Sequence, residues 1–286
     1  MSHYKLKEVR HGRYLFNTHD TYIGRSLDYY GEWSDAEIWL FGQIVRPGDT
    51  VLEAGANIGA HTVWLSRAVA HGQVFAFEPA RHTHQLLCAN LALNGCLNVH
   101  ALQQAIGSQN TSVDFPLIDP GQPNNFGAVS LISTTGFPVE KVPQVTLDTL
   151  ALDRLDFIKA DIEGMELQLL QGGLETIARH RPVLYLEMTA QEGSKTGNRD
   201  ALLGLLSPLH YQAYYFIAPM FNPQNFFCQT DDIFNAVSLD ILCVPHEKVE
   251  VLGLSQAQVG DGRLEIGNGA IGFEGEPWSS ARLRYR

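Results

Sequence analysis

The sequence contains no long hydrophobic run. No stretch of its 286 residues approaches the roughly 18 consecutive apolar residues of a membrane span, so we expect no membrane partner. Residues 1–5 (Met-Ser-His-Tyr-Lys) offer no apolar core of the kind found in a signal peptide. We therefore expect a cytoplasmic protein.

Basic residues are also scarce. The chain has 20 Lys and Arg residues against 31 Asp and Glu residues, which gives a formal net charge of −11. Binding to a phosphate backbone needs a basic face. The composition therefore predicts that nucleic acid is not a partner.

Cysteines are few and scattered. Cys88, Cys96, Cys228 and Cys243 form no pair at metal-ligand spacing, so we expect buried, reduced thiols. His82 and His84 are two residues apart on a predicted helix and would point to different faces. These residue types predict no zinc site.

The most informative segment that is present spans residues 50–62 (Thr-Val-Leu-Glu-Ala-Gly-Ala-Asn-Ile-Gly-Ala-His-Thr). It predicts a short buried strand, a glycine turn and the start of a helix, the place where an open α/β sheet binds a nucleoside. Dinucleotide sites use Gly-x-Gly-x-x-Gly, whose second glycine lets the pyrophosphate approach the backbone. Here that position is Asn57, which favours an adenosine cofactor without phosphates, S-adenosylmethionine.

The next predicted strand, residues 73–77, is a continuous apolar run that ends at Glu78. A carboxylate at this point can accept hydrogen bonds from both ribose hydroxyls. Dehydrogenases also have an acid that binds the ribose, so Glu78 indicates a nucleoside but does not identify the cofactor. Only Asn57 distinguishes S-adenosylmethionine from a dinucleotide.

Strands and helices alternate after residue 50, which predicts an α/β fold with a parallel sheet. We expect a helix over residues 81–93 and a third strand over residues 99–106. Residues 107–146 contain five of the thirteen prolines and predict an irregular insertion of loop and hairpin, either a lid or a plain surface excursion.

The sheet is expected to resume at residues 155–161 and to continue directly into an amphipathic helix with Glu163 and Glu166 in its first turn. Either acid could simply favour the positive end of that helix. Further strands are predicted over residues 182–188, 211–218 and 237–244, the last antiparallel, with a helix over residues 201–209.

A set of motifs in fixed order points to a family. Residues 51–62 are followed by Phe-Glu-Pro at 77–79, Thr-Leu-Asp at 146–148, Lys-Ala-Asp-Ile-Glu-Gly-Met-Glu at 159–166 and Glu187. In this combination the sequence closely resembles the FkbM family of methyltransferases over residues 12–246. One departure is Glu53, where members more often carry Asp.

The resemblance implies a class I methyltransferase (Rossmann-like) sheet of about seven strands, mostly parallel with an antiparallel last strand. It also implies S-adenosylmethionine as methyl donor and O-methylation of a hydroxyl on a small natural product or sugar. The expected cofactor-binding residues are Glu53, Gly55, Ala56, Asn57, Gly59, Glu78, Pro79, Gln104 and Ala105; for Ala105, plain packing is an equal alternative. This domain would span residues 50–247, between an N-terminal cap (1–49) and a β-rich extension (248–286) that could serve homo-oligomer assembly or substrate choice.

Methyl transfer needs alignment of the acceptor and removal of its proton. Asp161 and Glu163 are the predicted catalytic residues, although Asp161 could instead cap the following helix. Tyr30, Trp33 and Glu187 are the predicted acceptor-side residues.

Some alternatives remain open. Catechol O-methyltransferase and its relatives place magnesium ligands at the ends of the strands that here end in Asp161 and Glu187, but Met188 does not match that motif, so no metal is assigned. The acceptor could also be an amide or peptide nitrogen, or the chain could be a non-catalytic S-adenosylmethionine-binding module.

Overall fold

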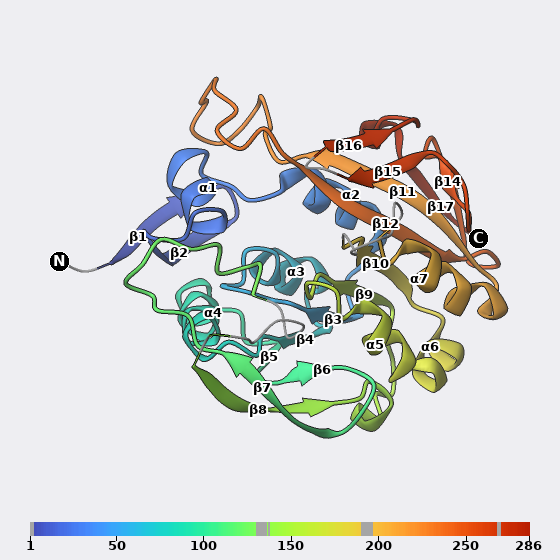
Figure 1. Cartoon of the computed structure of the whole chain (residues 1–286), viewed down its shortest axis with the longest axis horizontal. Helices are drawn as coiled ribbons and strands as arrows, with labels where there is room; N and C mark the ends of the chain where they lie inside the picture. Colours follow the sequence, from blue (N-terminus) through green and yellow to red (C-terminus); the bar gives the residue numbers. More distant parts are fainter. Residues whose placement is uncertain (1–2, 130–135, 137, 190–196, 268–269) are drawn as a thin grey trace.

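A computed structural model describes residues 3–129, 136, 138–189, 197–267 and 270–286. Its centre is an eight-stranded sheet in the order β14-β11-β12-β10-β9-β3-β4-β5 (Figure 1). The strands are β3 (Thr50–Ala54), β4 (Gln73–Phe77), β5 (Val99–Leu102), β9 (Phe157–Ala160), β10 (Val183–Glu187), β11 (Tyr211–Pro219), β12 (Val237–Pro245) and β14 (Gln256–Ala257).

The pairing follows the predicted pattern. β5, β4, β3, β9 and β10 run parallel, whereas β12 is inserted antiparallel between β10 and β11. Without β14, these are the seven strands and the antiparallel last strand expected for a class I methyltransferase sheet, and that prediction is confirmed. The eighth strand, β14, comes from the C-terminal extension.

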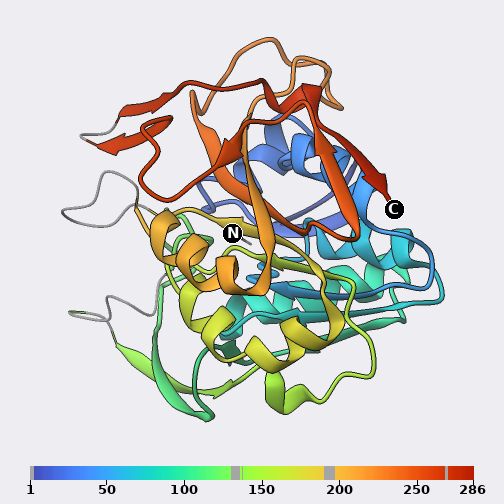
Figure 2. The ribbon, with the colours of Figure 1, turned by 90° about the vertical axis from the view of Figure 1, so that its right-hand side faces the viewer.

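Helices cover both faces of the sheet, as Figure 2 shows. Alternate residues of one strand enter two different cores: Leu52 packs with α5 (Glu166–Gln171), α6 (Leu174–His180) and α7 (Arg199–Leu206), and Val51 packs with α2 (Asp35–Ile44) and α3 (Thr62–Val69). Burial on both faces explains why the parallel strands read as continuous apolar runs. No helix in the described part of the chain has the length and apolar character needed to cross a membrane.

The predicted strand over residues 99–106 is wrong in its extent. The chain leaves the main sheet after β5, and β6 (Ala105–Ile106) joins β7 (Thr111–Pro116) and β8 (Val139–Val145) in a separate three-stranded sheet. β7 and β8 form the hairpin predicted within the insertion. The part of the predicted insertion at residues 130–135 and 137 lies outside the described residues.

The single helix predicted after residue 161 is also wrong, because two helices, α5 and α6, meet at Gly172–Gly173. A Cβ on Gly172 would lie 2.1 Å from the carbonyl oxygen of Gly107, so the two backbones lie too close together here for any side chain. Leu174, the first residue of α6, is 36% exposed. Glu163 precedes the first helix and adopts a left-handed backbone (φ 54°).

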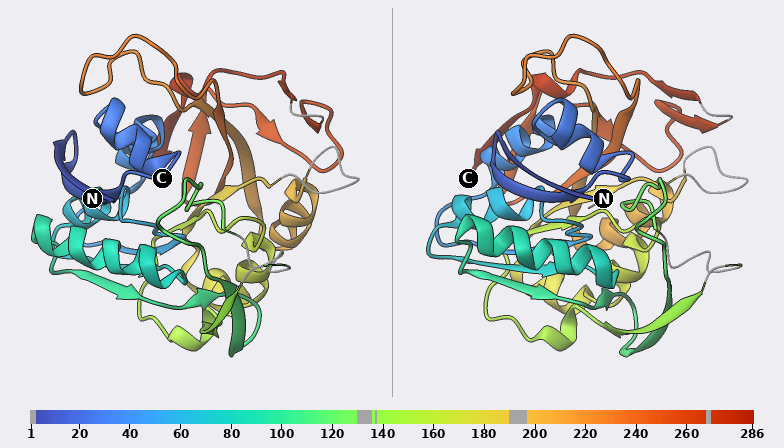
Figure 3. Two further views of the ribbon diagram at one scale, coloured as in Figure 1. Left: turned by 60° about the vertical axis from the view of Figure 1, so that its left-hand side comes forward. Right: turned by 90° about the vertical axis from the view of Figure 1, so that its left-hand side faces the viewer.

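The N-terminal cap consists of the hairpin β1 (Tyr4–Val9) and β2 (Gly12–Asn17), then α1 (Ile23–Tyr29) and α2. Figure 3 shows the dark blue hairpin beside the teal helix α4 (Arg81–Asn94). Asn90 of α4 holds the hairpin in this position. Its side-chain oxygen accepts a hydrogen bond from the Leu15 amide (2.7 Å), and its side-chain nitrogen donates one to the Leu15 carbonyl (3.1 Å).

The C-terminal extension is small β structure, as predicted. β13 (Val249–Leu252) pairs with β17 (Arg282–Tyr285), and β15 (Leu264–Gly267) pairs with β16 (Ala270–Phe273). The fully buried Arg199 of α7 forms an ion pair with Asp261 (3.0 Å) and thereby ties the extension to the sheet. The four cysteines are reduced, but the prediction that they are buried holds only for Cys243: Cys88 and Cys228 are exposed and Cys96 is partly exposed.

Candidate functional site

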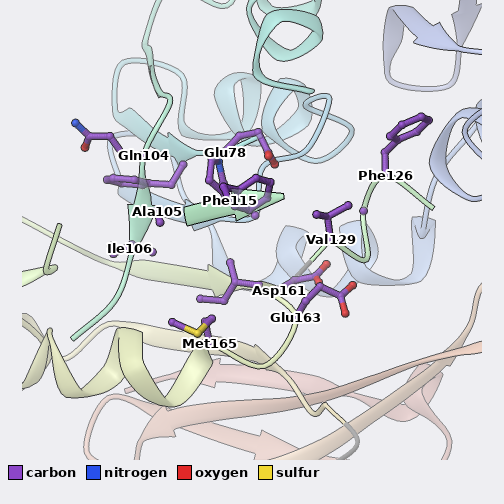
Figure 4. Close-up of a pocket in the computed structure, with 15 residues that line it drawn as sticks. Glu78, Gln104, Ala105, Ile106, Phe115, Phe126, Val129, Asp161, Glu163 and Met165 are labelled. Atoms are coloured by element: carbon purple, nitrogen blue, oxygen red, sulfur yellow. The ribbon is translucent and has the colours of Figure 1, made fainter. Parts of the chain in front are cut away.

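Two cavities adjoin at the carboxyl ends of β3, β4, β9 and β10, where an open parallel sheet binds its ligands. Both are lined by Gly55, Glu78, Gly127, Asp161 and Glu163. The first cavity extends toward β6 and the hairpin and is drawn in Figure 4. The second cavity extends toward α2, β10 and β12.

The turn after β3 holds these elements close together. Gly55 has φ +79°, and a Cβ at this residue would lie 1.8 Å from the carbonyl oxygen of Asp161, so only glycine fits. The backbone amides of Gly55 and Ala56 both donate hydrogen bonds to the Phe77 carbonyl (3.0 Å each). The turn is thus bonded to β4 and in contact with the end of β9.

Asn57 also has a left-handed backbone (φ 49°), which asparagine tolerates better than most residues. Its side-chain oxygen accepts a hydrogen bond from the Ile58 amide (2.7 Å), and its side-chain nitrogen faces Gly127 of the insertion. Asn57 and Ala56 line the second cavity. Gly59 lines neither cavity; a Cβ there would meet Leu87 of α4 at 2.9 Å, so this glycine serves helix packing.

Glu78 is fixed at the end of β4 by two backbone amides. Its Oε2 accepts from Asn57 (2.9 Å) and its Oε1 from Ala80 (2.8 Å). Burial raises the pKa of this carboxyl to about 7, although the two amide hydrogen bonds act in the opposite direction. The carboxylate therefore has a fixed orientation at the junction of the two cavities (Figure 4).

Glu53 lies deeper in β3 and lines the second cavity. It is 1% exposed, and its Oε2 accepts a hydrogen bond from Thr62 Oγ1 (2.6 Å). Burial raises its pKa to about 7, against the attraction of the nearby Lys159. The side chain thus links the strand to the first turn of α3.

Pro79, Gln104 and Ala105, which were predicted to bind the cofactor, line the first cavity together with Phe115 and Phe126 of the insertion. Figure 4 shows Phe115 beside Glu78 and Phe126 farther away, on the side of Val129. Neither was predicted, because nothing in their local sequence separates them from ordinary core residues of a hairpin. The insertion is therefore a wall of the site.

Carboxylates converge where the two cavities meet. One oxygen each from Asp161, Glu163 and Glu187 lie within 4.8 Å of one another, and Figure 4 shows the first two side by side. The pKa of Glu163 is raised to about 8, mainly by burial and to a smaller extent by the like charges of Asp161 and Glu166. Burial and the Asp161 charge likewise hold the pKa of Glu187 well above its ordinary value.

Lys159 is the cation next to this cluster. It is 2% exposed, and its Nζ lies 3.1 Å from Asp161 Oδ2. Although burial alone would lower its pKa, Asp161 and Glu53 hold that pKa above its ordinary value, so the ammonium remains charged. Lys159 thus fixes the orientation of the Asp161 carboxylate.

Glu166, in the first turn of α5, has the structural role at the helix start that was its alternative assignment. It is fully buried, and its Oε1 accepts from the amides of Ile162 (3.0 Å) and Gly164 (3.3 Å). These bonds close the turn that holds Glu163 in its left-handed conformation. Asn198 donates to the other oxygen of Glu166 (3.0 Å).

Of the two predicted acceptor-side aromatics, only Trp33 lines a cavity, the second one. Tyr30 lines neither cavity: its buried hydroxyl donates to the Asp231 carbonyl (2.9 Å) and accepts from the Ile233 amide (2.7 Å). We correct its assignment to that of a packing residue that ties the N-terminal cap to the β11–β12 connection. Glu37, His61 and Asp240 also line the second cavity, and no local motif had indicated them.

The raised carboxyl pKa values predict that the ligand-free protein loses stability as the pH rises from 6.5 to 8. Glu53 and Glu78 have pKa values of about 7 when folded and an ordinary value of 4.5, so the folded state binds more protons in this range. Each group then lowers the free energy of unfolding by about 1 kcal/mol over the range. Thermal unfolding at several pH values checks this, and Glu78→Gln should flatten the profile.

His61 acts in the opposite direction, because burial lowers its pKa below its ordinary 6.5. From pH 6.5 upward this adds only about 0.4 kcal/mol, less than the loss from the two glutamates. An unfolding temperature that increases from pH 6.5 to 8 would contradict the expectation. Glu175→Gln, on the exposed surface of α6, is the matched control and should leave the profile unchanged.

Comparison with known proteins agrees with this geometry. The model of a family described as the methyltransferase FkbM domain matches residues 53–216, more than half of the chain. Methyltransferase sdnD of Sordaria araneosa is 29% identical over 155 residues, and Methyltransferase 1 of Beauveria bassiana is 26% identical over 148. These alignments cover 43% and 44% of this chain, and the chain spans 59% of the length of each relative.

Among solved structures, the methyltransferase FkbM from Methylobacillus flagellatus KT is similar at 18% identity with a TM-score of 0.44, covering 72% of this chain and 50% of that one. The family match rests on the segment that contains the β3 turn, Glu78 and the Asp161 block. The chain therefore belongs to the FkbM domain family of methyltransferases.

Proposed function

We propose that the protein uses S-adenosylmethionine to methylate a hydroxyl group of a small natural product or sugar. The observation that carries this proposal is the junction of the two cavities, where the fixed Glu78 carboxylate and the Asp161–Glu163 pair line the same space. One cavity can hold the nucleoside, and the other can hold the methionine part and the acceptor.

The charge of the site supports this methyl donor. Among the described residues that line either cavity, Lys159 is the single lysine or arginine, and it is paired with Asp161. A pyrophosphate would lie beside Asn57 and the carboxylates without a cation of its own. The sulfonium and ammonium groups of S-adenosylmethionine are positive, so they complement the same carboxylates.

We assign the nucleoside to the first cavity. The Glu78 carboxylate, held by two backbone amides, would accept hydrogen bonds from the ribose hydroxyls. The adenine would lie among Gln104, Ala105 and Phe115.

The methionine part would then follow the β3 turn, along Gly55, Ala56 and Asn57, into the second cavity. Glu53 lines that cavity and bonds Thr62, so its role would be to hold the turn and to add negative charge near the ammonium group.

Methyl transfer itself is an in-line displacement, so these residues mainly align the acceptor and take up its proton. Lys159 holds Asp161 in place to orient the acceptor hydroxyl. Glu163 takes the proton, because its pKa of about 8 makes it a better proton acceptor near neutral pH than an ordinary carboxylate.

The second cavity, about 420 Å³, has the size of a small-molecule site. Its lining also includes Trp33, Tyr22 and Met220, which provide apolar and aromatic surface. This combination suits an acceptor with an apolar body and a hydroxyl group directed at Asp161 and Glu163.

Calorimetry tests the cofactor assignment. S-adenosylmethionine should bind the wild-type protein, and Glu78→Gln should weaken that binding by about 10- to 150-fold, the equivalent of one charge-assisted hydrogen bond of about 1.5–3 kcal/mol. Glu175→Gln, an exposed acid of α6, is the control and should bind like the wild type. Tight binding of NAD without binding of S-adenosylmethionine would overturn the proposal.

A further inference from the structure

Two polar side chains on the α2–α3 side of the second cavity have no part in the proposed transfer of the methyl group. Glu37 lies in the first turn of α2, and His61 directly precedes α3. Both line the second cavity, although Glu37 is only 7% exposed and His61 only 4% exposed. Polar groups that are buried to this extent normally have hydrogen-bond partners. The contacts of these two side chains therefore indicate what they can bind.

Glu37 and His61 approach each other without forming a hydrogen bond. Glu37 Oε1 accepts a hydrogen bond from Ser34 Oγ (2.7 Å), whereas Glu37 Oε2 lies 3.6 Å from His61 Nε2. That nitrogen is buried and has no hydrogen-bond partner among the described residues. The ring is held in place by an edge-to-face contact with Phe41 (5.6 Å between ring centroids) and by a hydrogen bond with the backbone of Ser34. The two facing atoms are thus fixed in position but not paired.

The distance between these two atoms suits one small polar group. An oxygen atom placed about 2.8 Å from both Glu37 Oε2 and His61 Nε2 would form two hydrogen bonds of ordinary length. Burying the two atoms without such a partner is unfavourable. A hydroxyl group of a bound molecule would supply the missing partner.

The surroundings favour a neutral ligand group over a cation. Burial, together with the positive charge of Lys159, lowers the pKa of His61 well below its ordinary value, so the ring is neutral. The same ammonium group would repel a second cation bound at the ring. A neutral imidazole has one donor and one acceptor nitrogen, and burial raises the pKa of Glu37 to about 7, so its carboxyl group can donate or accept near neutral pH. The pair therefore matches a hydroxyl group, which also donates and accepts.

We propose that Glu37 and His61 bind a second hydroxyl group of the acceptor, so that the acceptor is a sugar or a natural product with at least two hydroxyl groups. This inference rests on the proposed function. The hydroxyl that is methylated would lie at Asp161 and Glu163, and the second would lie between Glu37 and His61 in the same cavity. An acceptor with a single hydroxyl would leave the buried pair without its partner, so the pair would determine specificity.

Binding of matched alcohols to the full chain in complex with S-adenosylhomocysteine tests the pair without methyl transfer. The probes are rigid diols of increasing hydroxyl separation, from cyclohexanediols to dihydroxynaphthalenes, each compared by calorimetry with the corresponding compound that has one hydroxyl. At least one diol should bind the wild type at least about fivefold more tightly than its partner compound. His61→Phe and Glu37→Met should each remove this preference and leave binding of the single-hydroxyl compound unchanged.

His100→Phe is the matched control. His100 stacks on Phe75 at the edge of the sheet and lines neither cavity, so this variant should keep the preference. Nuclear magnetic resonance of the wild type, labelled at the histidine ring nitrogens, adds a readout that does not depend on the folding of a variant: the preferred diol should shift the Nε2 resonance of His61. A wild type that prefers no diol, an unshifted Nε2 resonance, or a preference that persists in both variants would overturn the proposal.

Calorimetry with S-adenosylmethionine on the same preparations separates the two proposals. Cofactor binding without a preference for any diol overturns the role of the pair alone. Weaker cofactor binding in both His61→Phe and Glu37→Met would assign the pair to the cofactor and would also overturn that role. A cooperatively unfolding wild type that binds neither the cofactor nor any alcohol overturns the proposed function as well.

Discussion

Replacing Gly55 by alanine is expected to lower the free energy of unfolding by about 2–5 kcal/mol and to abolish cofactor binding. The backbone of Gly55 is left-handed, which costs an L-residue about 1–2 kcal/mol, and the new Cβ would lie 1.8 Å from the Asp161 carbonyl oxygen. Relief of such an overlap requires backbone shifts, which cost about 1–3 kcal/mol more. Those shifts would move Asp161 away from Glu78. Urea unfolding and calorimetry measure the two effects.

Gly95→Ala is the control for the backbone strain alone. Gly95 also has a positive φ (+66°), at the end of α4, but a Cβ there would meet nothing within 4 Å. It should lose only about 1–2 kcal/mol and bind the cofactor normally. Equal losses of stability in the two variants would show that the contact between Gly55 and Asp161 is unimportant.

Glu163→Gln is expected to reduce methyl transfer by about 10²- to 10⁴-fold, the usual contribution of a positioned proton acceptor. An amide at this position cannot take the acceptor proton, whereas the side chain keeps nearly the same shape. The measurement uses methyl-labelled S-adenosylmethionine with a panel of phenols, sugars and amines, and follows both labelled product and S-adenosylhomocysteine. Transfer to an amine alone would replace the hydroxyl assignment by the N-methyltransferase alternative.

Two further readouts separate catalysis from folding. Glu163→Gln should bind S-adenosylmethionine within about threefold of the wild type, and Glu175→Gln should transfer at the wild-type rate. The wild-type rate should increase with pH as Glu163 loses its proton, with a midpoint at or below its pKa of about 8 because the cationic cofactor favours the charged carboxylate. A full rate in Glu163→Gln would exclude it as the proton acceptor.

Local pattern was sufficient for most elements of the sheet. β4 occupies residues 73–77 as predicted, and α4 ends at Asn94, one residue beyond the predicted end, with Gly95 as its left-handed cap. These elements are specified by apolar periodicity and by glycine and proline signals that lie within them. The same pattern failed at Gly172–Gly173, where the predicted helix is divided in two and the backbone of Gly172 lies against Gly107, 65 residues earlier in the chain.

The candidate site shows the same division. Glu78 was predicted from its position after a buried strand, and the structure adds that two backbone amides fix its orientation. Tyr30 was proposed for the acceptor side from its sequence context, but its hydroxyl is bonded to the backbone around residue 232. Such a contact between distant segments has no signature near Tyr30 itself.

The sequence by itself determined the order of strands and helices, the turn around Asn57 and the acids at the strand ends, because each depends on neighbours within a few residues. Only the tertiary structure decided that Asp161, Glu163 and Glu187 share one point and that Asp240 lies beside Glu187. The parallel register of β9 with β10 and the antiparallel register of β12 bring these carboxylates together. Burial among like charges then raises the pKa values of Glu163, Glu187 and Asp240, a property that belongs to the assembled sheet edge and to none of its strands alone.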